Sequence, residues 1–288
     1  MAEKMKPVIS VSRRTDIPAF YYDWLQTSLK NGSVEVPNPR FLKNTYVVDL
    51  QPENVHSLVL WSKDFRWVAK EPGLLANYNL YFQYTINNYA RLFEPGVPPY
   101  AETRKILGEM LRKYRPAQFN IRFDPVIISN AGEWSPVPEK PGLARLRCFE
   151  NLCRDLRSLG MQGCRISTSY IALYCHVKRR LAGAQIHFYH LEEDALLLFF
   201  AKMAEIADQY GFPLACCSSP LLQQVPALQK GSCIDGPLLE SLFGGRVSKA
   251  KDCGQRRDCG CTKSLDIGSY RQKCGFGCLY CYTAAIAR

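Results

Sequence analysis

The chain has 288 residues, 47% hydrophobic and 22% charged, so it can bury the core of one large α/β domain, and extensive disorder is excluded. The longest apolar run, residues 195–201, is too short to cross a bilayer, and residues 1–10 lack the apolar stretch of a signal peptide. We therefore expect a cytoplasmic protein with no membrane contact. The formal charge of +11 favours an anionic partner over a neutral one.

Short β-rich apolar runs alternate with segments of helical periodicity, the pattern of strand–helix units around a parallel sheet or barrel. The sequence predicts seven strands, at residues 8–12, 57–61, 80–86, 118–123, 164–168, 213–217 and 265–269. It predicts helices at residues 19–30, 64–69, 102–114, 143–159, 191–210 and 236–243, and a small hairpin within residues 34–50. We expect an α/β fold, a single TIM-like partial (β/α) barrel. Residues 1–215 form its body, and the cysteine-rich residues 216–288 complete it.

Polar side chains follow several of the predicted strands. The carboxyl ends of barrel strands carry the loops that form an active site, so these side chains should gather at one edge of the sheet. The residues that we expect there are Ser12, Arg13, Arg14, Asp16, Lys63, Asn87, Arg122, Asp124 and Cys216.

The cysteines are the most unusual feature of the composition. In a chain with no export signal, 13 cysteines favour metal chemistry over disulfides, and nine of them lie within residues 216–281. Cys274, Cys278 and Cys281 have the spacing C-x3-C-x2-C, with glycines that allow a short loop to wrap around a cluster. Three thiolates bind three irons of a [4Fe–4S] cubane and leave the fourth iron open. A zinc site would need a distant fourth ligand.

This triad, with the aromatic Tyr280 before its last cysteine, resembles the signature of the radical S-adenosylmethionine (SAM) enzymes. The resemblance implies that SAM binds the open iron and is cleaved reductively to a 5′-deoxyadenosyl radical, with Tyr280 near the adenine. It also implies a reducing partner such as flavodoxin or ferredoxin. The motif usually follows the first barrel strand. A circular permutation explains its place here, with residues 265–269 as the first strand and residues 8–12 as the second.

Over nearly its whole length the chain also resembles an uncharacterised bacterial and archaeal family of unknown function, whose C-terminal cysteines have been likened to radical SAM clusters. The matching segments are residues 12–18, 122–125, 233–236 and 259–261. This resemblance implies no particular substrate.

The strand at residues 8–12 would be second in unpermuted order, where radical SAM enzymes contact the methionine amino group of SAM. Ser12, Arg13, Arg14 and Asp16 are therefore candidate SAM ligands, because Asp16 can accept from the amine and an arginine can pair with the carboxylate. Arg122 and Asp124 are further candidates at the same edge. The alternatives are an ordinary salt bridge with Asp16 as a helix N-cap, and an Arg122–Asp124 pair that joins neighbouring strand ends.

A second cysteine set predicts an auxiliary [4Fe–4S] cluster. The favoured ligands are Cys216, Cys233, Cys259 and Cys261, with Cys217 and Cys253 in reserve. A structural zinc ion or a [2Fe–2S] centre could use the same residues.

These observations predict a radical SAM enzyme that abstracts hydrogen from an unidentified substrate, which the positive charge suggests is anionic or a nucleic acid. Two other classes of protein fit the cysteines alone. One is a non-catalytic iron–sulfur electron carrier or sensor, and the other is a zinc-stabilised nucleic-acid-binding protein.

Overall fold

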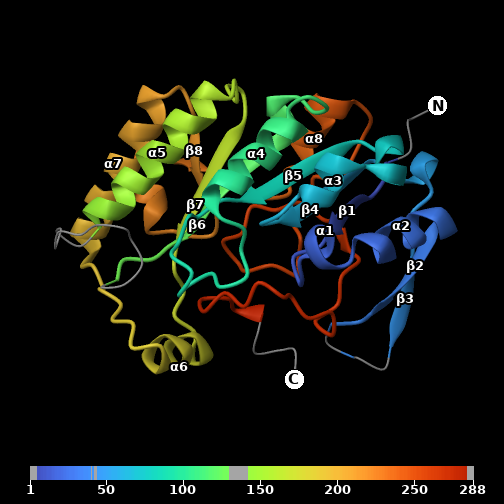
Figure 1. The fold of residues 1–288 in the computed structure, drawn as a ribbon. Coiled ribbons are helices and arrows are strands. Elements are labelled where there is room, and N and C mark those ends of the chain that lie inside the picture. Colours follow the sequence, from blue (N-terminus) through green and yellow to red (C-terminus); the bar gives the residue numbers. More distant parts are fainter. Residues whose placement is uncertain (1–4, 40, 42–43, 130–141, 284–288) are drawn as a thin grey trace.

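A computed structural model describes residues 5–39, 41, 44–129 and 142–283 of the chain. Its centre is a parallel eight-stranded sheet with the order β10-β1-β4-β5-β6-β7-β8-β9 (Figure 1). The strands are β1 (Val8–Val11), β4 (Ser57–Ser62), β5 (Leu80–Thr85), β6 (Phe119–Val126), β7 (Arg165–Tyr170), β8 (Leu214–Cys216), β9 (Gln229–Lys230) and β10 (Leu265–Asp266). The α/β class is confirmed. Within the described residues no pairing joins β9 to β10, so the sheet is open there and a closed barrel is not observed.

All seven predicted strands are present, with shifted ends, and the predicted hairpin is formed by β2 (Ser33–Pro37) and β3 (Thr45–Asp49). The two-residue β9 was not predicted because both of its residues are polar and exposed. The helices are α1 (Ile17–Phe20), α2 (Tyr22–Asn31), α3 (Arg66–Lys70), α4 (Tyr100–Met110), α5 (Leu143–Ser158), α6 (Cys175–Gly183), α7 (Glu193–Gln209) and α8 (Gly236–Phe243). Within the described residues, no helix is both long enough and apolar enough to cross a membrane.

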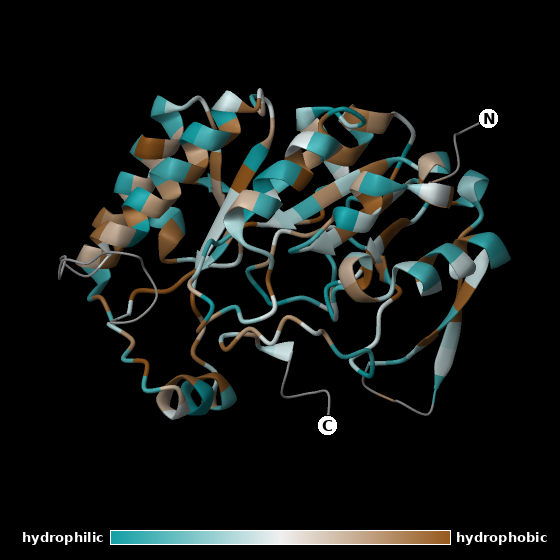
Figure 2. Ribbon diagram, in the orientation of Figure 1, coloured by the Kyte–Doolittle hydropathy of each residue, from teal (hydrophilic) through white to brown (hydrophobic). Residues whose placement is uncertain are grey.

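The sheet is buried on both faces. Side chains alternate along a strand, so Ile9 and Val11 of β1 face the main core, which they share with residues of α2, α4, α5 and α7. Figure 2 shows hydrophobic and hydrophilic residues interspersed along α5 and α7, as expected for helices that bury one side. Val8 of β1 and Val59 of β4 face the opposite side and pack in a second core with Cys233, Cys259 and Cys261.

A single stretch of chain, residues 231–264, leads from β9 at one edge of the sheet to β10 at the other. This crossing segment includes α8 and packs on the face that the second core occupies. Buried amides attach it to the strands beneath. The Gln83 amide donates to the Cys233 carbonyl oxygen at 2.5 Å, and the Asn120 amide donates to Gln83 Oε1 at 2.7 Å.

The carboxylate of Asp266 fastens β10 to β1. It accepts hydrogen bonds from Ser10 Oγ at 2.9 Å, from Ser12 Oγ at 2.5 Å and from the Arg13 backbone N–H at 2.8 Å. Only two residue pairs join these strands, so this side chain provides much of the attachment. It brings the C-terminal part of the chain beside the first strand.

We predict that Asp266→Ala lowers the free energy of unfolding by about 3 kcal/mol, because the buried hydroxyls of Ser10 and Ser12 lose their acceptor. Urea unfolding followed by circular dichroism measures the change. The control is Asp208→Ala at the exposed end of α7, which should change the free energy by less than about 0.5 kcal/mol. Equal losses in the two variants would contradict this role of Asp266.

Candidate functional site

The loop after β10 carries the terminal triad, Cys274, Cys278 and Cys281, and is docked on loops that follow other strands. The Leu279 N–H donates to the Phe93 carbonyl oxygen and the Gly96 N–H donates to the Phe276 carbonyl oxygen, both at 3.0 Å. Phe276 packs edge-on against Phe20, with 4.7 Å between ring centroids. Gly96 permits this approach, since a Cβ there would lie 2.8 Å from the Gly275 carbonyl oxygen. The triad is therefore held at the carboxyl-end edge of the sheet, as predicted for the active-site loops.

The three thiols of the triad differ in exposure. Cys278 is buried, Cys281 is half-buried and Cys274 is exposed. Burial raises the pKa of Cys278 to about 12. Although Cys274 is exposed as a residue, the protein atoms around its thiol partly desolvate it, and this and the neighbouring Asp16 carboxylate raise its pKa to about 12. Without a metal, these two thiols stay protonated at neutral pH. Metal binding here would release protons.

A buried ion pair lies beside Cys278. Lys63 Nζ donates to Glu94 Oε1 at 2.7 Å and to Tyr280 Oη at 2.9 Å, and Asn87 Nδ2 donates to Tyr280 Oη at 2.9 Å. Burial opposes the charge of Lys63, but the attraction of Glu94 and Cys278 is larger and raises the Lys63 pKa. Burial likewise opposes the charge of Glu94, but Lys63 outweighs it and lowers the Glu94 pKa. Both groups are charged at neutral pH.

Tyr280, the residue predicted to lie near an adenine, has its hydroxyl in this ion-pair network. Its hydroxyl donates to Glu94, and the Lys63 ammonium lies 5.5 Å from the centre of its ring. These contacts anchor the triad loop to the ends of β4 and β5. Lys63 and Asn87 were recognised as strand-end residues, but the proline-rich sequence around Glu94 gave no signal for its role.

Asp16 caps α1, as the alternative interpretation of the sequence held. Its Oδ1 accepts from the Ala19 N–H at 3.1 Å and from Ser62 Oγ at 2.7 Å, and its Oδ2 accepts from the Lys63 N–H at 2.9 Å. Burial outweighs these hydrogen bonds and raises the Asp16 pKa to about 7. Asp16 is the member of the predicted SAM-binding set that lies beside the triad, next to Cys274.

The other predicted SAM ligands after β1 are engaged by residues 252–268. Ser12 donates to Asp266, and Arg13 Nη1 pairs with Asp252 Oδ2 at 2.9 Å. Arg14 Nη1 donates to the Gly268 carbonyl oxygen at 2.7 Å. These contacts hold the end of β1 to the C-terminal part of the chain.

Arg122 and Asp124 form the ion pair that was the alternative to SAM binding. Ser169 Oγ also donates to Asp124. Both Arg122 and Arg13 lie over the Trp61 ring. The guanidinium carbon of Arg122 is 5.1 Å from the ring centroid, and that of Arg13 is 5.6 Å from it. The two arginines thus share one aromatic side chain on the sheet face that the crossing segment covers.

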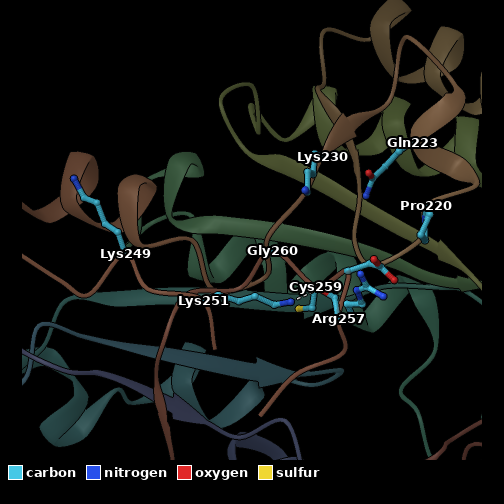
Figure 3. Close-up of a pocket in the computed structure, with 9 residues that line it drawn as sticks. Pro220, Gln223, Lys230, Lys249, Lys251, Arg257, Cys259 and Gly260 are labelled. Atoms are coloured by element: carbon cyan, nitrogen blue, oxygen red, sulfur yellow. Dashed lines mark hydrogen bonds between the residues drawn. The ribbon is translucent and has the colours of Figure 1, made fainter. Parts of the chain in front are cut away.

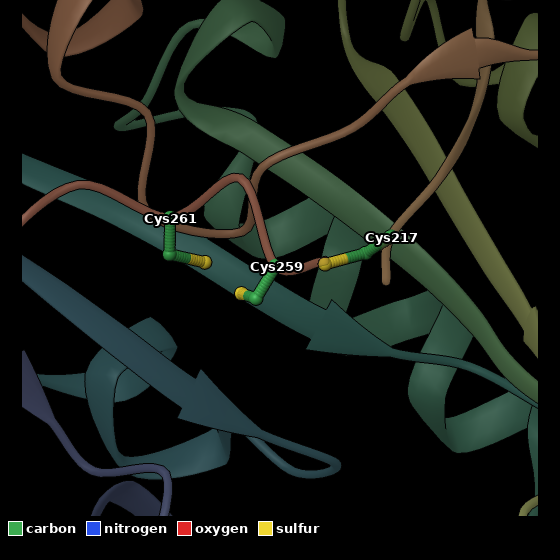
Figure 4. A group of neighbouring side chains, drawn as sticks. All are labelled: Cys217, Cys259 and Cys261. Atoms are coloured by element: carbon green, nitrogen blue, oxygen red, sulfur yellow. The ribbon is translucent and has the colours of Figure 1, made fainter. Parts of the chain in front are cut away.

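A compact group of thiols lies on that same face. The sulfur atoms of Cys217, Cys259 and Cys261 all lie within 4.8 Å of one another, and Figure 4 shows them directed toward a common centre. The Cys233 thiol interacts with those of Cys217 and Cys261. We call Cys217, Cys233, Cys259 and Cys261 the four-cysteine set. Hydrogen bonds from the other three thiols lower the pKa of Cys261.

The prediction that Cys216 belongs to this set is wrong. Cys216 is fully buried in the main core on the helical face of the sheet. Side chains alternate along a strand, so its neighbour Cys217 faces the opposite side and joins the thiols there. The alternation of Leu214, Ala215, Cys216 and Cys217 was a signal for this choice. Cys253, the other reserve, is exposed and outside the group.

A shallow pocket of about 340 Å³ borders Cys259 (Figure 3). Its lining contains one acidic side chain, Asp258, and four basic ones, which come from β9 and the crossing segment: Lys230, Lys249, Lys251 and Arg257. Such a lining attracts an anionic group.

We predict that Glu94→Gln lowers the free energy of unfolding by about 3 kcal/mol at neutral pH, because it leaves the buried Lys63 without a counter-charge. The difference in unfolding free energy between variant and wild type should become smaller as the pH falls below 4.5, the ordinary glutamate pKa. Protonation of Glu94 then removes the same charge from the wild type. Urea unfolding at several pH values measures it. Glu205→Gln, in an exposed pair with Lys202, should cost less than about 0.5 kcal/mol. A deficit that is the same at every pH would contradict the charged pair.

Comparison with known proteins gives a family without an assigned activity. No curated protein and no solved structure matches the chain. The model of a family described as a domain of unknown function, DUF1848, matches residues 8–283. Because this match covers nearly the whole chain, the protein belongs to that family.

Proposed function

We propose that this protein is a radical SAM enzyme whose terminal triad holds a [4Fe–4S] cluster. The observation that carries the proposal is the strand order. With β10 taken as the first strand, the remaining strands of the sheet follow in chain order, from β1 to β9. The C-x3-C-x2-C motif then comes directly after the first strand, which is its usual place in radical SAM enzymes. A permuted partial barrel accounts for both the strand order and the position of the motif.

The number of triad thiols supports a cluster over a single zinc ion, which would need a fourth ligand. The thiols of Cys274, Cys278 and Cys281 lie within electrostatic reach of one another. Each thiolate of a cubane binds a different iron. Three thiolates also leave one iron open for SAM.

Reductively cleaved SAM would supply a 5′-deoxyadenosyl radical that abstracts hydrogen from the substrate. The chain's own residues prepare the environment. The Lys63 ammonium would offset the negative charge of a thiolate at Cys278. It partly counteracts the rise that burial causes in the pKa of the Cys278 thiol. The docked loop, with Phe276, Cys278 and Tyr280 buried, keeps water away from this side of the triad.

The substrate class follows from charge. The formal charge of +11 and the basic lining of the pocket beside Cys259 favour an anionic substrate, such as a phosphorylated metabolite or a nucleic acid. In the cell, the electron would come from a carrier such as flavodoxin or ferredoxin.

The test is anaerobic reconstitution with iron and sulfide, followed by dithionite and SAM, with 5′-deoxyadenosine measured by chromatography. We expect the wild type to form 5′-deoxyadenosine and Cys278→Ala to form none, because loss of one thiolate removes a cluster ligand. Cys253→Ala, at an exposed cysteine outside both sets, should match the wild type.

Failure of the reduced, iron-loaded wild type to form 5′-deoxyadenosine would contradict the proposal. A cluster that is reduced without SAM cleavage would indicate the electron carrier or sensor. A protein that binds zinc and takes up no iron would indicate the zinc-stabilised nucleic-acid-binding protein.

A further inference from the structure

The four-cysteine set is marked by the close spacing of three of its sulfurs. With zinc–sulfur bonds of about 2.3 Å in a tetrahedron, the sulfurs of a zinc site lie about 3.8 Å apart. The sulfurs of Cys217, Cys259 and Cys261 all lie within 4.8 Å of one another, which is close to this arrangement. A cubane would hold the same thiolates on four separate irons and spread them further apart.

Cys233 is the candidate for the fourth ligand, because it packs in the second core with Cys259 and Cys261, and Cys217 packs against that core. Its thiol interacts with those of Cys217 and Cys261. Its backbone is fixed by the hydrogen bond from Gln83 to its carbonyl oxygen, 2.5 Å long. The next N–H, that of Ile234, points to Cys261 Sγ at 3.4 Å. An N–H that donates to a ligand sulfur stabilises the negative charge of the thiolate form.

Two partly buried cations lie near the site. Arg13 and Arg122 lie within electrostatic reach of Cys261 and Cys233 respectively. Nη2 of Arg13 and Nε of Arg122 are buried, and neither has a hydrogen-bond partner among the described residues. Four thiolates around a divalent ion carry a net charge of about −2. The two guanidinium groups, each of which also pairs with an aspartate, would lie near this charge.

From this geometry we propose that Cys217, Cys233, Cys259 and Cys261 bind a single Zn²⁺ ion in a closed structural site. The proposal goes beyond the SAM chemistry and does not rest on it. It replaces the auxiliary [4Fe–4S] cluster that the sequence suggested.

The place of the ligands in the chain explains what the ion does. Cys217 follows β8, Cys233 lies near the start of the crossing segment, and Cys259 and Cys261 lie near its end, just before β10. One ion therefore ties both ends of the crossing segment to the sheet. With four cysteine ligands, a tetrahedral ion has no open position for a substrate.

Metal analysis tests the site with the full chain. The protein is expressed with both zinc and iron in the medium, purified anaerobically and analysed by mass spectrometry of its metals. We expect about one zinc per chain in the wild type, and the same zinc but no iron in the triple variant Cys274→Ala/Cys278→Ala/Cys281→Ala. Cys259→Ser/Cys261→Ser should lose the zinc, while Cys253→Ser, in the same segment, should keep it.

X-ray absorption at the zinc edge of the wild type needs no variant and so does not depend on their folding. It should show four sulfur neighbours at about 2.3 Å. Nitrogen or oxygen ligands, a wild type without zinc, or about four irons and no zinc in the triple variant would each overturn the proposal. Absence of 5′-deoxyadenosine would not, because zinc content is measured independently of SAM cleavage.

Discussion

The carboxylate of Asp266 joins the two ends of this fold. It accepts from two serine hydroxyls and one backbone amide at the end of β1, and so holds a two-residue strand from the end of the chain against the first strand. The loop that follows therefore emerges beside residues that lie more than 200 positions earlier in the sequence, among them Asp16 and Lys63. The contacts of that loop with Phe93, Gly96 and Lys63 then complete the docking of the terminal triad.

The two cysteine sets occupy different environments. The four-cysteine set lies between the crossing segment and the sheet, beside Arg13 and Arg122, where a closed ion would stabilise the covering layer. The triad lies at the carboxyl-end edge, beside the Lys63–Glu94 pair, where loops from several strands converge. Under the two proposals, the first set would stabilise the fold and the second would carry the chemistry.

The sequence was sufficient for seven strands of the large sheet, whose predicted runs contain buried apolar or β-branched residues, and for the neighbour relation of β10 and β1. What it did not predict has physical causes. Cys216 and Cys217 are adjacent, and only the direction of each side chain decides which of them joins the other thiols. The assignment of Arg13, Arg14 and Arg122 to SAM stays a prediction. The pair of Arg122 with Asp124 was foreseen from their proximity in the sequence, whereas the partners of Arg13 and Arg14, Asp252 and Gly268, depend on long-range packing. Glu94 was missed because its importance comes from Lys63, which lies 31 residues away.

The central claim is that the terminal triad leaves one iron open for SAM. If the four-cysteine set holds zinc, the terminal cluster is the protein's one source of a paramagnetic iron–sulfur signal after reduction. The direct test is the electron paramagnetic resonance spectrum of the dithionite-reduced protein, recorded before and after addition of SAM. Binding of SAM to the open iron should shift the g-values of the signal. A spectrum that is unchanged at saturating SAM would contradict the claim.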